Sequence, residues 1–137
     1  MDYLSATGQI AGAALRAQSL RMRVIAENMA NANATGRSPG ADPYQRKTVT
    51  FESSLDDATQ VESVRIGEIG HSTAPFRIER IPGHPAADAS GNVKLPNVDM
   101  LVEVGDMNEA NRSYGANLKM IKVANDLVSM TLDLLRT

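Results

Sequence analysis

The sequence predicts a mainly α fold, in which long N- and C-terminal helices pack as a coiled coil around a small irregular or β middle segment. All six prolines of the 137-residue chain fall within residues 36–97, and proline costs about 3 kcal/mol inside a helix. Apolar or small residues recur at alternating steps of four and three on both sides of that region. Hydrophobic residues make up 42% of the chain and aromatic residues only 4%, which favours close helix packing over a large aromatic-lined pocket.

We divide the chain into an N-terminal helical assembly segment, 1–35, a proline-rich middle segment of loops and short strands, 36–97, and a C-terminal helical assembly segment, 98–137. The apolar stripe of the first segment runs through Leu4, Gly8, Ala11, Leu15, Gln18, Met22, Ile25 and Met29. Its period of 3.5 residues is that of a coiled coil. Its small residues would let another backbone approach closely.

The middle segment predicts short strands at 45–51, 61–69 and 76–81, where Val, Ile, Thr or Phe partly alternate with polar residues. Residues 83–92 predict a loop, with a turn at 88–91. The acidic pair Asp56 and Asp57 predicts a solvated turn, because adjacent carboxylates do not converge on one substrate.

Two neighbouring apolar stripes mark the last segment. The first runs through Tyr114, Leu118, Ile121, Asn125, Val128, Leu132 and Leu135, and the second through Met120, Ala124, Leu127, Met130 or Thr131, and Leu134. Asn97, after Pro96, is the expected N-cap of this helix. Because one partner helix covers only one stripe, the other predicts an interface with neighbouring chains. We expect the ends of an isolated molecule to fray and to order on docking.

The charge and cysteine counts exclude several classes of function. Lys and Arg number 14 and Asp and Glu 16, giving a net charge of −2, and the basic patch of Arg16, Arg21 and Arg23 lacks interleaved aromatic residues. Both observations argue against a nucleic-acid partner. With no cysteine, there is no disulfide, thiolate metal site or cysteine nucleophile. We expect neither a secretory signal peptide at the N-terminus nor a membrane span.

The sequence contains few residues that could form a catalytic or metal site. His71 and His84 are the only histidines, and with Asp88 they would form a weak ligand set for a small metal-dependent hydrolase. There is no nucleophile elbow, phosphate-cradling glycine loop or zinc-protease motif. We therefore expect no catalytic, cofactor or metal residues, no small-molecule substrate and no enzymatic activity.

The stripes and the asparagines define the expected assembly interface. Eight of nine asparagines lie in or beside the helical segments, and a buried asparagine can fix register at a cost in stability. The expected interface residues are Leu4, Ala11, Leu15, Met22, Ile25, Asn28, Asn31, Tyr114, Asn117, Leu118, Ile121, Asn125, Leu127, Val128, Leu132 and Leu135.

Several runs resemble one known family. Residues 28–36, Asn-Met-Ala-Asn-Ala-Asn-Ala-Thr-Gly, resemble the N-terminal signature of the bacterial flagellar rod and hook axial proteins. Residues 82–99 and the run Ser-Tyr-Gly-Ala-Asn at 113–117 are similar to the approach to the C-terminal helix, and to its interior, in the short proximal-rod members of that family. The runs 10–12, 17–19 and 43–47 match as well, and residues 51–75 match least.

This resemblance implies a structural subunit of the flagellar basal-body rod, the periplasmic drive shaft that transmits torque. Its expected partners are copies of itself, other rod proteins and the flagellar type III export apparatus, which exports without a cleaved signal peptide. In that family the terminal helices of one chain pair and pack against neighbours, and the middle segment lies further out. The alternative is a soluble coiled-coil adaptor or a type III-secreted interaction protein, which would form a defined oligomer in dilute solution.

Overall fold

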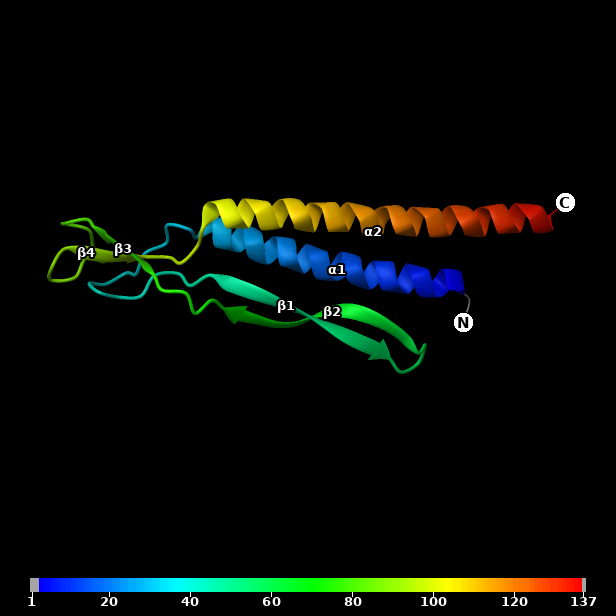
Figure 1. The fold of residues 1–137 in the computed structure, drawn as a ribbon, viewed down its shortest axis with the longest axis horizontal. Coiled ribbons are helices and arrows are strands. Elements are labelled where there is room, and N and C mark those ends of the chain that lie inside the picture. The colour runs from blue at the N-terminus through cyan, green and yellow to red at the C-terminus, as the bar shows by residue number, and fades with distance from the viewer. Residues whose placement is uncertain (1–2, 137) are drawn as a thin grey trace. The chain divides into compact units, whose positions relative to one another are not determined.

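The computed structural model describes residues 3–136 and consists of two helices separated by four strands (Figure 1). In chain order the elements are α1 (Tyr3–Ala30), β1 (Lys47–Asp56), β2 (Val61–His71), β3 (Arg77–Arg80), β4 (Asn92–Leu95) and α2 (Met100–Leu135). β1 pairs with β2 in one two-stranded sheet, and β3 pairs with β4 in another. Neither helix combines the length and apolar character needed to cross a membrane within these residues.

The chain forms two compact units, the first built from three stretches of the sequence and the second from two. The first unit contains residues 3–22, 50–68 and 108–136, and the second contains residues 23–49 and 69–107. Each helix contributes to both units. The two units are described separately below.

In the first unit, the beginning of α1 lies antiparallel to the later part of α2, and the β1–β2 hairpin follows α1 (Figure 1). The buried residues on the helix surfaces of this unit include five alanines, Ala11, Ala13, Ala17, Ala110 and Ala124. The guanidinium of Arg21 joins the three elements, because it lies 3.8 Å from the Glu109 carboxylate on α2 and 6.0 Å from the centre of the Phe51 ring on β1. Such cation–π contacts add modest stability.

In the second unit, β3 and β4 are antiparallel, with Arg77 opposite Leu95 and Arg80 opposite Asn92. Val93 and Leu95 of β4 form a small core with Ala86. The connection between these strands contains the predicted turn at 88–91, which is confirmed. The Asp88 carboxylate accepts hydrogen bonds from the backbone N–H groups of Ser90 and Asn92 at 2.8 and 2.9 Å.

The predicted fold class is wrong, because the fold is α+β and a coiled coil is not found in residues 3–136. The strands β1 and β2 contain 10 and 11 residues, so the middle is not a small irregular segment. In the first unit the buried positions of α1 are Ala11, Ala13 and Ala17, whereas Leu4 and Leu15 are only half-buried. Those buried positions do not follow one seam, because α1 is covered by both α2 and the hairpin.

Three local predictions also need correction. β1 continues past Phe51 to Asp56, because Ser53 and Ser54 are held by cross-strand contacts rather than by strand propensity: Ser53 Oγ donates to Glu62 at 2.5 Å. β4 lies in a stretch for which no strand was predicted. The N-cap of α2 is Asp99 and not Asn97, since Asp99 Oδ1 accepts from the N–H of Leu101 at 2.9 Å. The turn at Asp56 and Asp57 is confirmed.

Candidate assembly site

Asn28, in the last turns of α1, is the centre of a buried polar cluster in the second unit. Its side chain is 1% exposed. Its Nδ2 donates to the Lys47 carbonyl at 2.9 Å, and its Oδ1 accepts from the Lys47 N–H at 2.9 Å and from the Tyr44 hydroxyl at 2.8 Å. The amide therefore pairs with both backbone groups of Lys47, as a neighbouring strand would, and holds the start of β1 against α1.

Glu103, in the first turn of α2, is completely buried and completes this cluster. It accepts hydrogen bonds from Asn28 Nδ2 at 3.3 Å and from the Arg46 guanidinium Nε. The same guanidinium lies 3.3 Å from Asp106 through its Nη2. A buried carboxylate is costly unless it is paired and hydrogen-bonded, so Glu103 requires α1 and the 44–47 segment to be in place. We call Asn28, Tyr44, Arg46 and Glu103 the Asn28 cluster.

Tyr44 is the titratable hydroxyl of the Asn28 cluster. Burial raises the pKa of Tyr44 above its usual value, and the nearby carboxylates of Glu27 and Glu103 raise it further. All three influences favour the neutral phenol, which is the form that donates to Asn28. Glu27 is itself paired with the Lys47 ammonium at 2.9 Å.

Asn97 fixes the segment that leads into α2. Its Oδ1 accepts from the Arg46 N–H at 2.8 Å, and its Nδ2 donates to the carbonyls of Ser72 and Ala74 at 3.3 and 2.9 Å. Asn97 therefore joins three separate loops instead of capping the helix. Together with the Asn28 cluster, it explains how the second unit is held by polar contacts although its apolar core is small.

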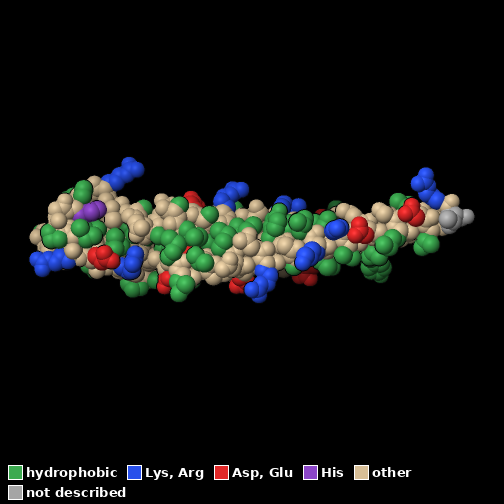
Figure 2. Space-filling model, turned by 90° about the horizontal axis from the view of Figure 1, so that it is seen from above, with side chains coloured by type: hydrophobic (Ala, Val, Ile, Leu, Met, Phe, Trp, Pro, Cys, Tyr) green, Lys and Arg blue, Asp and Glu red, His purple; other side chains and the backbone are tan. Residues whose placement is uncertain are grey.

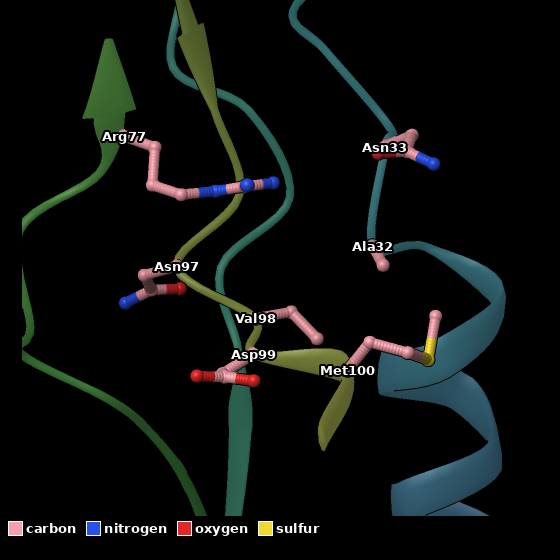
Figure 3. Close-up of a pocket in the computed structure, with 7 residues that line it drawn as sticks. All are labelled: Ala32, Asn33, Arg77, Asn97, Val98, Asp99 and Met100. Atoms are coloured by element: carbon pink, nitrogen blue, oxygen red, sulfur yellow. The ribbon is translucent and has the colours of Figure 1, made fainter. Parts of the chain in front are cut away.

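The run 28–36 contains residues with different structural roles. The Asn31 side chain, just after α1, donates to the Glu27 carbonyl at 2.8 Å. Gly36 lies where a Cβ would stand 2.7 Å from the Ala41 carbonyl oxygen, so a side chain there would collide with backbone. Asn33 is exposed at the edge of a pocket lined also by Ala32, Arg77 and residues 97–100 (Figure 3).

The first unit carries an exposed apolar face on α2. Figure 2 shows hydrophobic side chains on the surface towards the C-terminal end of the chain, interspersed with charged ones. The large apolar residues exposed there are Leu118, Met120, Val123, Leu127, Val128, Met130, Leu132, Leu134 and Leu135, and their exposed fractions run from 39% to 79%. A polar stripe of Lys122, Asp126, Ser129, Asp133 and Arg136 lies beside them at steps of four and three.

Two shallow grooves hollow this surface. One, of about 540 Å³, is lined by Leu118, Ile121, Asn125 and their charged neighbours. The other, of about 260 Å³, lies between the two helices and is lined by Leu4, Gly8, Ile121, Ala124 and Val128 among others. An exposed apolar face of this kind typically marks a protein interface.

The predicted interface residues differ in how far their own chain covers them. Ala11, Ile25 and Asn28 are buried. Leu4, Leu15, Met22, Asn31, Tyr114, Asn117 and Ile121 are half-buried. Leu118, Asn125, Leu127, Val128, Leu132 and Leu135 are exposed. Their part in assembly stays a prediction.

Tyr44, Arg46 and Glu103 are residues that sequence reasoning missed. One signal could have found Glu103. Continued backwards from Tyr114 at the α-helical period of 3.6 residues rather than in strict 4-3 alternation, the first stripe reaches Ala110, Met107 and Glu103. A carboxylate on an apolar stripe needs a partner of opposite charge, and Arg46 is that partner.

Two of the three candidate metal-ligating residues, His84 and Asp88, hold backbone groups in the second unit, and His71 is the last residue of β2. His84 Nδ1 accepts from the Ala86 N–H at 3.1 Å, and the Asp88 carboxylate accepts from the backbone N–H groups of Ser90 and Asn92. Hydrogen bonding to backbone N–H groups, that of Asn92 first, lowers the pKa of the Asp88 carboxyl. No group of three or more His, Cys, Asp and Glu side chains that could hold a metal ion occurs in residues 3–136.

Comparison with known proteins identifies the family. Residues 89–134 match the family model described as the flagellar basal body rod FlgEFG protein C-terminal region. The chain is 54% identical over 136 residues to the flagellar basal-body rod protein FlgC of Agrobacterium fabrum, covering 99% of this chain and 98% of the relative. It is 41% and 38% identical over 125 residues to the FlgC proteins of Yersinia enterocolitica and Salmonella typhimurium, covering 91% of this chain and 92% of each relative. The chain therefore belongs to the FlgC family of flagellar basal-body rod proteins.

Proposed function

We propose that this chain is a non-enzymatic structural subunit of the proximal part of the flagellar basal-body rod. It polymerises through its terminal helices, with copies of itself and with other rod proteins, into a shaft that transmits torque. The observation that carries this proposal is the exposed apolar face at the C-terminal end of α2. Membership in the rod family supports it.

The energetics of that face favour association. Leu127, Leu132 and Leu135 are 46%, 56% and 79% exposed. Complete burial of a leucine side chain gains about 1.5–3 kcal/mol relative to full exposure. Covering the remaining exposed part of these three side chains would therefore contribute about 3–5 kcal/mol. These are three of the nine large apolar side chains exposed on this face, and the burial of the other six adds to the gain that has to exceed the cost of association.

We also propose that the three segments of the chain have different roles. Segments 1–35 and 98–137 make the contacts between subunits, and segment 36–97 lies further out. The subunit works in the periplasm and reaches it through the flagellar type III export apparatus without a cleaved signal peptide. Gly8 and Gly12 support this proposal, because each glycine in α1 costs about 1 kcal/mol of helix stability relative to alanine. A helix weakened in this way unfolds more easily, as passage of an unfolded chain through the export apparatus requires.

The assembly proposal is tested by a pair of aspartate substitutions on neighbouring stripes of α2. Leu127→Asp places a charge on the apolar face, whereas the control Ser129→Asp places the same charge on the polar stripe. Both side chains are exposed in the single chain, so neither change should unfold it. Each variant is expressed in a strain that lacks the gene, and swimming in soft agar and the amount of the chain in purified basal bodies are measured.

Leu127→Asp should abolish swimming and incorporation, because a buried unpaired charge costs several kcal/mol. Ser129→Asp should swim. Normal swimming by Leu127→Asp at normal protein levels would contradict the proposal. Export is tested separately: in a strain with an inactive export apparatus the chain should stay in the cytoplasm, and mass spectrometry of the chain from basal bodies should find an uncleaved N-terminus.

A further inference from the structure

Gln18, in the middle of α1, has a buried polar atom without a partner in the first unit. It lies on the same apolar stripe as Ala11 and Ile25, seven residues before and after it, and both of those side chains are buried. The Gln18 side chain is half-buried, but its Oε1 is shielded from solvent and has no hydrogen-bond partner within residues 3–136. The proposed role of the α2 face gives this amide no function.

Asn28, ten residues later on the same helix, shows what a buried amide requires. Its side chain makes four hydrogen bonds, to Lys47, Tyr44 and Glu103. A buried acceptor that lacks a donor costs the full free energy of its desolvation, whereas apolar groups of the same shape can be neutral or stabilising in its place. The amide of Asn28 therefore stabilises the second unit, and the amide of Gln18 destabilises the first.

The beginning of α1 is also loosely packed against α2, which is a separate source of weakness. The buried side chains of α1 in the first unit are all alanines, which bury less apolar area than larger side chains would. A groove of about 260 Å³ lies between the helices here, lined by Leu4 and Gly8 on α1 and by Ile121 and Val128 on α2. A Cβ added to Gly8 would meet no atom of α2 within 4 Å. Few contacts therefore hold these turns of α1 in place.

We propose that Gln18 is a destabilising residue built into the first unit, which allows residues 3–22 of α1 to separate from α2 while the Asn28 cluster stays intact. Segments with few buried apolar contacts open at a lower free energy than the rest of a protein. The opened segment supplies the export apparatus with a stretch of chain that is already unfolded. This inference rests on the proposed function, because it assigns a residue to the export step.

Two matched substitutions test this role in the purified chain. Gln18→Met replaces the buried amide with an unbranched apolar side chain of similar length, and Gln9→Met makes the same change at an exposed position of the same helix. Glutamine and methionine have similar helix propensities, so a difference between the two variants reports on the buried amide. Amide hydrogen exchange at residues 11–17, measured by NMR, should slow at least tenfold in Gln18→Met and less than twofold in Gln9→Met.

Exchange at Lys47 shows whether the opening is local. The Lys47 N–H is donated to Asn28 Oδ1 in the second unit, so its exchange rate should be the same in Gln18→Met and in the unsubstituted chain. Equal slowing at Lys47 and at residues 11–17 would mean that the whole chain opens at once. Equal exchange in the two methionine variants would mean that the Gln18 amide does not weaken α1. Either result overturns the inference.

The export step is followed in cells by pulse labelling, as the rate at which the chain leaves the cytoplasmic fraction. Gln18→Met should leave at least threefold more slowly than the unsubstituted chain and Gln9→Met. Gly8→Ala strengthens the same part of α1 by another route, because alanine is the better helix former, and it should slow departure as well. If both variants slow hydrogen exchange but leave the cytoplasm at the normal rate, opening of α1 does not control export and the inference is wrong.

The inference and the proposed function fail differently. If the unsubstituted chain needs an active export apparatus to leave the cytoplasm but Gln18→Met leaves just as fast, the inference is overturned and the proposed function stands. If the unsubstituted chain leaves equally well when the apparatus is inactive, the proposed export route is wrong, and the role of Gln18 in export is wrong with it.

Discussion

Replacing Asn28 with alanine should destabilise the second unit far more than the same replacement of Asn31, the next asparagine in the run 28–36. The change removes four hydrogen bonds, three to neutral groups of Tyr44 and Lys47 and one to the Glu103 carboxylate. A neutral hydrogen bond contributes about 0.5–1.5 kcal/mol net and one to a charged group about 1.5–3 kcal/mol. The expected loss is therefore about 3–7 kcal/mol, a large part of the 5–15 kcal/mol of stability typical of a domain.

The matched control for this prediction is Asn31→Ala. Asn31 lies just after α1, in the same run, and its side chain donates to the Glu27 carbonyl in the last turn of that helix. This variant should therefore change the free energy of unfolding by no more than about 0.5 kcal/mol.

Two measurements check the pair of variants. Urea denaturation followed by far-UV circular dichroism gives the free energy of unfolding. Amide hydrogen exchange by NMR gives a local readout at Lys47, whose N–H is donated to Asn28 Oδ1. Exchange at Lys47 should become at least a hundredfold faster in Asn28→Ala and stay unchanged in Asn31→Ala. Equal stabilities of the two variants, with Lys47 still protected in both, would refute the role given to the Asn28 cluster.

Three further predictions concern Tyr44, Asp88 and Gly36. The pKa of Tyr44 is raised in the folded chain. Its contribution to stability is therefore complete below about pH 10 and is lost as the pH rises through the folded-state pKa. Urea midpoints measured from pH 8 to 11 should fall less steeply in Tyr44→Phe than in the unsubstituted chain. The pKa of Asp88 is lowered in the folded chain. Its contribution to stability is therefore present above about pH 4 and is lost as the pH falls through the folded-state pKa. NMR chemical shifts of the β3–β4 pair should follow that acid transition, and Asp88→Asn should remove the transition. Gly36→Ala should destabilise the chain by about 1–3 kcal/mol, because the added Cβ would meet the Ala41 backbone. Gly8→Ala, with open space around it, should stabilise the chain by up to about 1 kcal/mol. Thermal unfolding measured for both variants tests the two predicted signs.

The helices were predictable because their signal is local. The prolines at positions 39, 43, 75, 82, 85 and 96 argue against helix at those positions, and the apolar stripes on either side of them continue through α1 and α2. The coiled coil was predicted wrongly from the same stripes. A period of 3.5 residues indicates which face is apolar, but it does not say whether a helix or a strand covers that face, and α1 is covered in part by the β1–β2 hairpin.

The strands and the buried cluster were harder to predict because their causes are not local. β4 is held by its pairing with β3 and by the burial of Val93 and Leu95. The glycine before it and the proline after it are residues typical of loops. Asn28 finds its partners 16 to 75 residues away in the chain. The run that contains it could be noticed in the sequence, but its contacts with Tyr44 and Glu103 depend on the folded arrangement.

The most direct test of the account asks whether the apolar face of α2 is covered in the assembled rod. Leu127→Cys and Ser129→Cys can each be labelled with a maleimide, since the sequence contains no other cysteine. Both should react within minutes in the free chain, because both positions are exposed. In purified basal bodies Leu127→Cys should be protected at least tenfold more than Ser129→Cys. Equal labelling of the two positions in basal bodies would contradict the claim that this face forms the contact between subunits.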